Sequence, residues 1–84
     1  MSVKHRYEWG LDAIMAELGV SQNALWLASG VRPATLRAYV SGDIQRINLE
    51  QLTALLDALN RIAASQGVKR RYNVEDLLSY KPRE

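Results

Sequence analysis

The chain has 84 residues, no cysteine and a formal net charge of +2, which indicates one small domain and excludes disulfides, thiolate metal sites and cysteine nucleophiles. Hydrophobic residues make up 48% of the sequence, too many for a disordered tail, but no apolar run reaches the ~20 residues of a membrane span or forms a signal-peptide core. We therefore expect a cytoplasmic globular protein without membrane contact, in which charge alone does not identify a nucleic-acid binder.

The first elements predicted along the chain are a short strand and a short helix. Apolar and polar residues alternate in VKHRYEW, residues 3–9, which is typical of one strand. Over residues 11–18 the apolar positions recur at the spacing of one helix face, and Gly19 ends this helix. The residues expected to face the core from it are Leu11, Ile14, Met15 and Leu18.

The stretch SQNALWLASGVRPATLRAYVSG predicts two short helices with a sharp break between them, over residues 22–29 and 33–41. Ser21 is a suitable N-cap for the first helix, and Gly30 tolerates the positive φ that a sharp turn needs. Pro33 suits the first position of the second helix, because its missing N–H would have no partner there. The spacing therefore predicts a helix pair joined by a tight turn.

Two more helices complete the chain. Asn48 predicts an N-cap with Gln51 in the reciprocal capping position, and the apolar stripe that follows continues to about Gly67. Asn73 caps a last short helix. The expected fold is an all-α domain of five helices spanning residues 1–84, with its core between about residues 11 and 80, to which the N-terminal strand can be added.

On a helical wheel of about 100° per residue, the helix over residues 33–41 has a buried and an outward face. Leu36, Tyr39 and Val40 share the buried face. The outward side is slim and carries Ala34, Arg37, Ala38 and Ser41. A slim helix with one arginine fits the major groove, where Arg37 can pair with guanine and an alanine can contact a thymine methyl. The wheel equally permits a face that only meets solvent.

The chain resembles the helix-turn-helix domain of the phage-repressor and Cro-like (Xre-type) family over roughly residues 11–80. Segment 48–59 matches the family pattern, and so do, at the right mutual spacing, Gln22, Leu25, Gly30, Val31, Thr35, Leu36 and Gly42. The resemblance implies that the helix over 33–41 reads the major groove and the helix before it crosses the backbone. It assigns phosphate contact to Gln22, base contact to Arg32, Pro33, Ala34 and Arg37, backbone contact to Thr35, Gln45 and Arg46, and either kind to Ser41.

The sequence departs from that family pattern at three places. Trp26 stands where two helices cross closely and the family prefers a small residue. Arg32 replaces the usual serine or threonine N-cap and puts a cation at a positive helix end. The segment over residues 61–71 lengthens the connection between the last two helices.

Several residues outside the helix pair admit two interpretations. Leu25, Trp26 and Leu27 point to three sides of one helix, so the surplus apolar surface packs on the N-terminal segment or forms a subunit interface. The basic stretch Lys69–Arg71 is a solvated turn or a phosphate clamp. His5 is the one histidine and no nucleophile–base pair is visible, so we expect no metal site, no cofactor and no enzymatic activity.

The resemblance and the residues together predict a sequence-specific regulator that binds double-stranded DNA, most simply a repressor that acts as a homodimer on a two-fold site. The alternative is a protein-interaction module, such as an antitoxin-like partner-binding protein, that keeps the fold without reading DNA. Trp26 and the low net charge favour this alternative.

Overall fold

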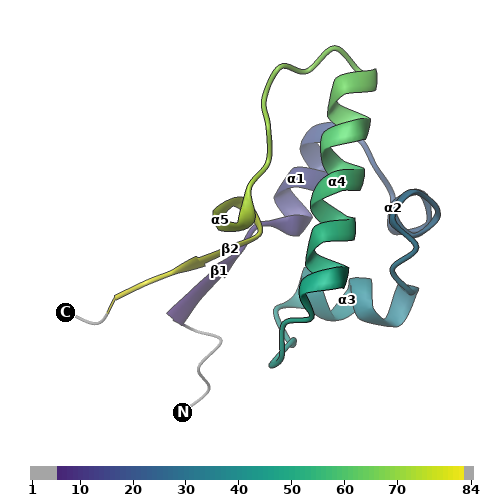
Figure 1. Ribbon diagram of the computed structural model, residues 1–84. Helices are drawn as coiled ribbons and strands as arrows, with labels where there is room; N and C mark the ends of the chain where they lie inside the picture. The colour runs from purple at the N-terminus through teal and green to yellow at the C-terminus, as the bar shows by residue number, and fades with distance from the viewer. Residues whose placement is uncertain (1–5, 83–84) are drawn as a thin grey trace.

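Five helices and a two-stranded sheet form the part of the chain that the computed structural model describes, residues 6–82 (Figure 1). The elements in chain order are β1 (Tyr7–Trp9), α1 (Leu11–Leu18), α2 (Gln22–Ser29), α3 (Pro33–Ser41), α4 (Leu49–Ser65), α5 (Val74–Leu77) and β2 (Leu78–Tyr80). The five predicted helices are confirmed, as is the N-terminal strand at Tyr7–Trp9. The remainder of the predicted strand, Val3 to His5, lies outside the described residues.

Local signals set the ends of the helices. The Oγ atom of Ser21 accepts a hydrogen bond from the backbone N–H of Ala24 at 3.0 Å and so caps α2. The Oδ1 atom of Asn48 caps α4 in the same way, accepting from the N–H of Gln51 at 3.1 Å. The helices therefore begin where the capping residues of the sequence place them.

Helix α4 stands at the centre of the molecule, with α1 and α2 on different sides of it and α3 across its first turns (Figure 1). Its residues Leu55, Ala58 and Leu59 are fully buried. The core around them includes Leu11, Ile14, Met15, Leu18, Leu25, Leu36, Tyr39 and Leu77. Full burial of one such leucine side chain contributes about 1.5–3 kcal/mol, so this shared core fixes how the helices pack.

The sheet joins the two ends of the described chain. β1 and β2 pair antiparallel, with Tyr7 opposite Tyr80 and Trp9 opposite Leu78. The sequence did not predict β2, because its hydrogen-bonding partner lies almost the whole chain away. Gly10 permits this close approach, since a Cβ there would overlap the carbonyl oxygen of Asp76.

Side-chain hydrogen bonds tie the long connection between α4 and α5 to the body. Asn60 pairs with the backbone of Tyr72 twice, donating to its carbonyl oxygen at 3.1 Å and accepting from its N–H at 2.7 Å. The Tyr72 hydroxyl donates to Glu17 on α1 at 2.8 Å, and the Gln66 amide donates to the Leu18 carbonyl at 2.7 Å. The lengthened segment is therefore anchored at both of its ends.

Candidate nucleic-acid interface

The turn between α2 and α3 is held by its own hydrogen bonds. Gly30 has a φ of 76°, a region that favours glycine, and its N–H donates to the Trp26 carbonyl at 2.7 Å. The Ser29 hydroxyl donates to the Leu25 carbonyl at 2.7 Å and accepts from the Val31 N–H at 3.1 Å. Val31 is itself buried in the core. These contacts fix the direction in which α3 leaves the turn.

Helix α3 is oriented by two core residues. Leu36 is fully buried and Tyr39 is 3% exposed, so both face the core, as the helical wheel predicts. The residues exposed on the other side are Ala34, Arg37 and Ser41. Ala38, which the wheel also places on the outward side, is half-buried and contributes less exposed surface there.

Three exposed arginines lie on or next to α3. Arg32 precedes the helix, Arg37 lies in its middle, and Arg46 lies in the loop after it. Among residues 6–82, none of the three forms an ion pair with a carboxylate. Their guanidinium groups can therefore bind external anions such as phosphates, or base edges.

The other predicted site residues surround this arginine group. Pro33 is the first residue of α3, Thr35 is half-buried in its first turn, and Gln45 is exposed beside Arg46 in the following loop. Gln22 begins α2 and is half-buried. The structure thus gathers all but Gln22 onto α3 and the residues that flank it.

Two carboxylates stand close to these residues, and the sequence did not single them out for a role. The Ser41 hydroxyl donates to Asp43 Oδ2 at 3.0 Å, so this predicted contact residue already has a partner within the protein. Glu50, in the first turn of α4, shares a shallow hollow with Arg32 and Thr35. Negative charges beside a group of arginines reduce its non-specific attraction to phosphate and so favour selective contacts.

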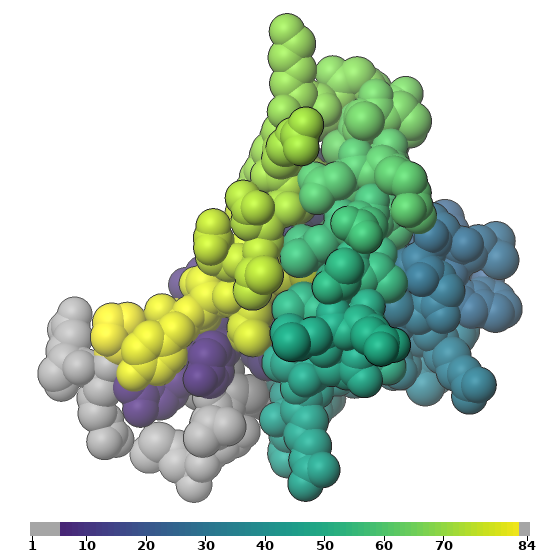
Figure 2. All heavy atoms as spheres, viewed as in Figure 1, coloured from purple at the N-terminus to yellow at the C-terminus, as the bar shows by residue number. Residues whose placement is uncertain are grey.

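The basic stretch Lys69–Arg71 lies at the other end of the molecule from α3 (Figures 1 and 2). Helix α4 separates the two ends, and its 17 residues span about 25 Å. Arg70 is engaged within the protein, pairing with Glu17 and Asp76 at 3.2 Å each and stacking over the Tyr72 ring at 4.8 Å. This stretch therefore anchors the long connection and does not extend the surface around α3.

The surplus apolar surface of α2 is open. Leu25 is fully buried, whereas Trp26 is 38% and Leu27 is 71% exposed. Figure 1 shows β1 and α2 on different sides of α4. Residues 1–5 of the N-terminal segment, against which one interpretation places this surface, lie outside the described residues. Trp26 turns outward, which lets α2 and α4 cross closely despite its size.

Residues 6–82 contain no group of three or more side chains that could hold a metal ion. In the same range, no helix is long and apolar enough to cross a membrane. His5, the one histidine of the sequence, lies outside the described residues.

Comparison with known families gives one match. Residues 10–61, more than half of the chain, match the family model of the Cro/C1-type helix-turn-helix DNA-binding domain. Searches of the curated proteins and of the solved structures each gave no match. The matched range runs from the end of β1 through most of α4 and includes the turn and all of α3. The chain therefore belongs to the Cro/C1-type helix-turn-helix family of DNA-binding domains.

Proposed function

We propose that the chain is a cytoplasmic, sequence-specific regulator of transcription that binds duplex DNA as a homodimer and represses by occupying its operator. The observation that carries this proposal is the outward face of α3. It presents Arg37 beside the small side chain of Ala34, with Arg32 at its start, and neither arginine has a carboxylate partner within residues 6–82. Leu36 and Tyr39 hold that face away from the core.

Each residue of the face has a defined task in this proposal. An α-helix fits the major groove, where Arg37 donates two hydrogen bonds to O6 and N7 of a guanine. Ala34 contacts a thymine methyl, and Arg32 and Pro33 meet base edges at the start of α3. The contacts that position the protein on the phosphates come from Gln22, Thr35, Gln45 and Arg46, and Ser41 joins either set.

The small size of this surface is the argument for repression by a dimer of two chains. One helix reads only a few base pairs, so a second copy is needed to specify one operator in a genome. Occupying the operator needs no surface beyond the one that binds DNA. A homodimer on a two-fold site is therefore the simplest arrangement that uses α3.

The test begins with selection of bound sequences from a random duplex library. On the selected site, Arg37→Ala is expected to cost about 1–3 kcal/mol of binding and to relax the preference at one base pair. Arg71→Ala removes the same charge at the far end of the molecule and serves as the matched control. It is expected to leave the binding free energy and the base-pair preference unchanged. Fluorescence anisotropy with the selected and the scrambled duplex measures the two effects.

Arg37→Lys separates charge from base reading, because lysine keeps the positive charge but lacks the planar fork of arginine. It is expected to retain most of the binding to scrambled DNA and to lose preference for the selected site. Equal weakening of Arg37→Ala on every sequence would reduce Arg37 to a phosphate contact. No change on any sequence would contradict the proposed face.

A second candidate function has one observation in its favour. Trp26 and Leu27 form an open apolar surface on α2, which suits a protein-interaction module that does not read DNA. Salt dependence distinguishes the two functions. A DNA binder releases counterions and weakens steeply with salt on random duplex DNA, whereas an interaction module shows almost no binding even at low salt.

A further inference from the structure

A hollow of about 630 Å³ lies between the second half of α4 and the connection that leads to α5. Its lining includes the carboxylate residue Asp57 and four basic residues, Arg61, Lys69, Arg70 and Arg71. These side chains define the basic hollow. Sites for small molecules usually have a volume of about 300–1,000 Å³, so the basic hollow has the size of a ligand site. The charge of its lining predicts an anion.

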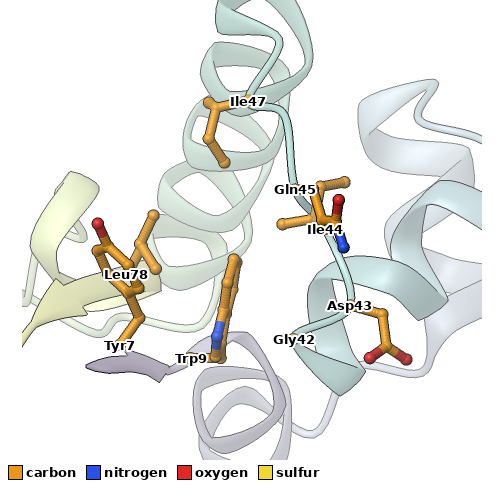
Figure 3. A pocket seen from close by; sticks show the side chains of 8 residues that line it. All are labelled: Tyr7, Trp9, Gly42, Asp43, Ile44, Gln45, Ile47 and Leu78. Carbon is orange, nitrogen blue, oxygen red and sulfur yellow. The ribbon is translucent and has the colours of Figure 1, made fainter. Parts of the chain in front are cut away.

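The lining of the cavity beside Trp9, between the sheet and the loop that follows α3, is different in kind (Figure 3). Tyr7 and Trp9 lie on one side of that cavity, and Ile44 and Ile47 lie on the other. None of its described lining residues is a lysine or an arginine. An anion is therefore attracted to the basic hollow and not to this cavity.

The two walls of the basic hollow are tied to each other. Asn60 lines the hollow and pairs twice with the backbone of Tyr72, at 2.7 and 3.1 Å, which holds the connection against α4. Arg70 forms ion pairs with carboxylates of α1 and α5 at 3.2 Å each. Lys69 and Arg71 flank Arg70 in the chain, so an anchored backbone carries them. A site that is already ordered loses less entropy when a ligand binds.

Three of the four cations are available to an external anion. Among residues 6–82, none of Arg61, Lys69 and Arg71 forms an ion pair with a carboxylate. The planar forks of the two arginines match the oxygens of a phosphate, and the lysine adds a point charge. The described lining thus offers three unpaired cations against one carboxylate, which suits a ligand with at least two negative charges.

We propose that the basic hollow binds a small anion that contains two or more linked phosphates, such as pyrophosphate. Linked phosphates can pair with cations from both walls at once, which a single phosphate does less well. The basic hollow is at the end of the molecule opposite α3, so a duplex bound by α3 does not reach it (Figures 1 and 2). The ligand is therefore a free anion and not the backbone of the bound operator.

Arg61 links the basic hollow to the helix pair. Its Nη2 group donates to the carbonyl oxygen of Ala28, in the last turn of α2, at 2.7 Å. Carbonyl groups in the last turn of a helix lack partners within the helix, and a cation there interacts favourably with the helix dipole. A guanidinium group has five N–H donors, so it can hold this carbonyl and an anion together. A bound anion therefore fixes Arg61 and, through it, the end of α2.

This link makes the bound anion an effector, a step that rests on the proposed function. Helix α2 leads directly into the turn that sets the direction of α3. An anion that orders Arg61 restrains this turn before DNA binds, so we expect it to raise the affinity for DNA. DNA then raises the affinity for the anion by the same factor.

The first experiment uses the full chain without DNA, in phosphate-free buffer with about 0.15 M NaCl, and so tests the site independently of the proposed function. A ¹H–¹⁵N spectrum follows the Nε–H signal of Arg61 and the backbone N–H signal of Ser29 as pyrophosphate is added. Both signals are expected to move in a saturable way, with a Kd below about 1 mM. The indole signal of Trp9, at the other cavity, is expected to stay in place.

Lys69→Gln tests the location, because it removes one charge from the lining at an exposed position. It is expected to lower the affinity for pyrophosphate about tenfold. Lys81→Gln makes the same change at an exposed residue after β2, outside the basic hollow, and should leave the affinity unchanged. The absence of a saturable shift, or equal loss in both variants, would overturn the site. Tighter binding of sulfate or of a hexaglutamate peptide than of pyrophosphate would overturn the class of ligand.

The second experiment measures the Kd for the selected duplex with and without saturating pyrophosphate, at constant ionic strength, in the natural chain and in Lys69→Gln. Competition by the anion at α3 is the same in both proteins, so the difference between them isolates the basic hollow. A gain in DNA affinity of about threefold or more in the natural chain relative to the variant supports the effector role. Equal ratios in the two proteins would overturn that role alone. A protein that binds pyrophosphate and no duplex would overturn the proposed function while leaving the anion site intact.

Discussion

Arg32 immediately precedes α3, at the N-cap position where a hydrogen-bonding side chain would stabilise the helix. It makes no side-chain capping hydrogen bond, and Pro33 follows it as the first helical residue. A missing cap costs about 0.5–2 kcal/mol, and the cation meets the positive end of the helix dipole. A DNA phosphate near this end would offset both costs, so in the proposed complex we expect Arg32 to exchange stability of the free protein for binding.

Arg32→Ser tests this exchange. The serine restores the cap and is expected to stabilise the protein by about 1 kcal/mol, or about 4–8 °C in Tm. It also removes the proposed contact to DNA, so we expect the affinity to fall and, where that contact is a phosphate, the slope of log K against log salt to flatten by about 0.9. A thermal melt and a salt titration measure the two effects. Lower stability with unchanged affinity would make Arg32 a structural residue.

Tyr72 gives the fold a sensitivity to alkaline pH. Its side chain is 2% exposed, and burial, followed by the hydrogen bond to Glu17, raises the pKa of its hydroxyl above the ordinary value of about 10. An unfolded chain ionises this group at lower pH than the folded protein does. The contribution to stability is therefore complete below about pH 10 and is lost as the pH rises through the folded-state value.

We expect the urea midpoint of the natural sequence to fall above about pH 10, and Tyr72→Phe to flatten that fall because phenylalanine has no hydroxyl to ionise. Part of the fall remains in the variant, since burial also raises the pKa of Tyr39. Tyr80→Phe changes a 56% exposed ring and is the matched control. The same pH profile for all three proteins would show that Tyr72 ionises equally in both states.

At the scale of elements, α3 depends on Leu36 for its orientation. The side chain is fully buried, so Leu36→Ala removes core contacts and leaves a cavity at a cost of about 2–5 kcal/mol. A small domain has about 5–15 kcal/mol of stability in total, so this loss populates the unfolded state. Leu27→Ala makes the same change on the exposed face of α2 and should cost little. Equal urea midpoints for the two variants would contradict the orientation of α3.

The helices were predictable because their signals are local. Ser21, Asn48 and the glycines that end α2 and α3 each act within one turn of chain, and periodicity predicts that Leu36 faces inward. The strand β2 was not predictable in this way, because it pairs with β1 from the opposite end of the chain. The half-burial of Ala38 likewise depends on neighbouring elements that the wheel does not contain.

In the candidate site, too, some features follow from local sequence and others depend on the three-dimensional structure. The outward position of Arg37 follows from the helix period, and the roles assigned to Gln45 and Arg46 came from the family resemblance. The contact of Ser41 with Asp43 depends on side-chain geometry, and so does the cavity beside Trp9. The distance of Lys69–Arg71 from α3 required the path of α4 in space. Sequence therefore indicates which residues face outward, while structure decides which of them act together.

At the scale of the whole molecule, the proposed dimer has to fit the spacing of DNA. The molecule measures 40 × 26 × 21 Å, similar to the ~34 Å that separates successive major grooves on one side of the duplex. Two copies bound one turn apart are therefore close enough to touch. The open apolar surface of Trp26 and Leu27, on a helix adjoining α3, is one candidate for that contact, and Val74 on α5 is a second candidate.

We expect two chains to bind one selected duplex, with half-sites related by two-fold symmetry and centred about 10 base pairs apart. Leu27→Glu places a charge in the proposed contact, so it should weaken cooperative binding to the full site while leaving binding to a single half-site unchanged. Val74→Glu, on the other candidate surface, is the matched comparison, and the variant that loses cooperativity identifies the interface. Light scattering of the complex gives the stoichiometry. One chain bound to an optimal site that lacks symmetry would contradict the dimer, because a single α3 would then supply all the specificity.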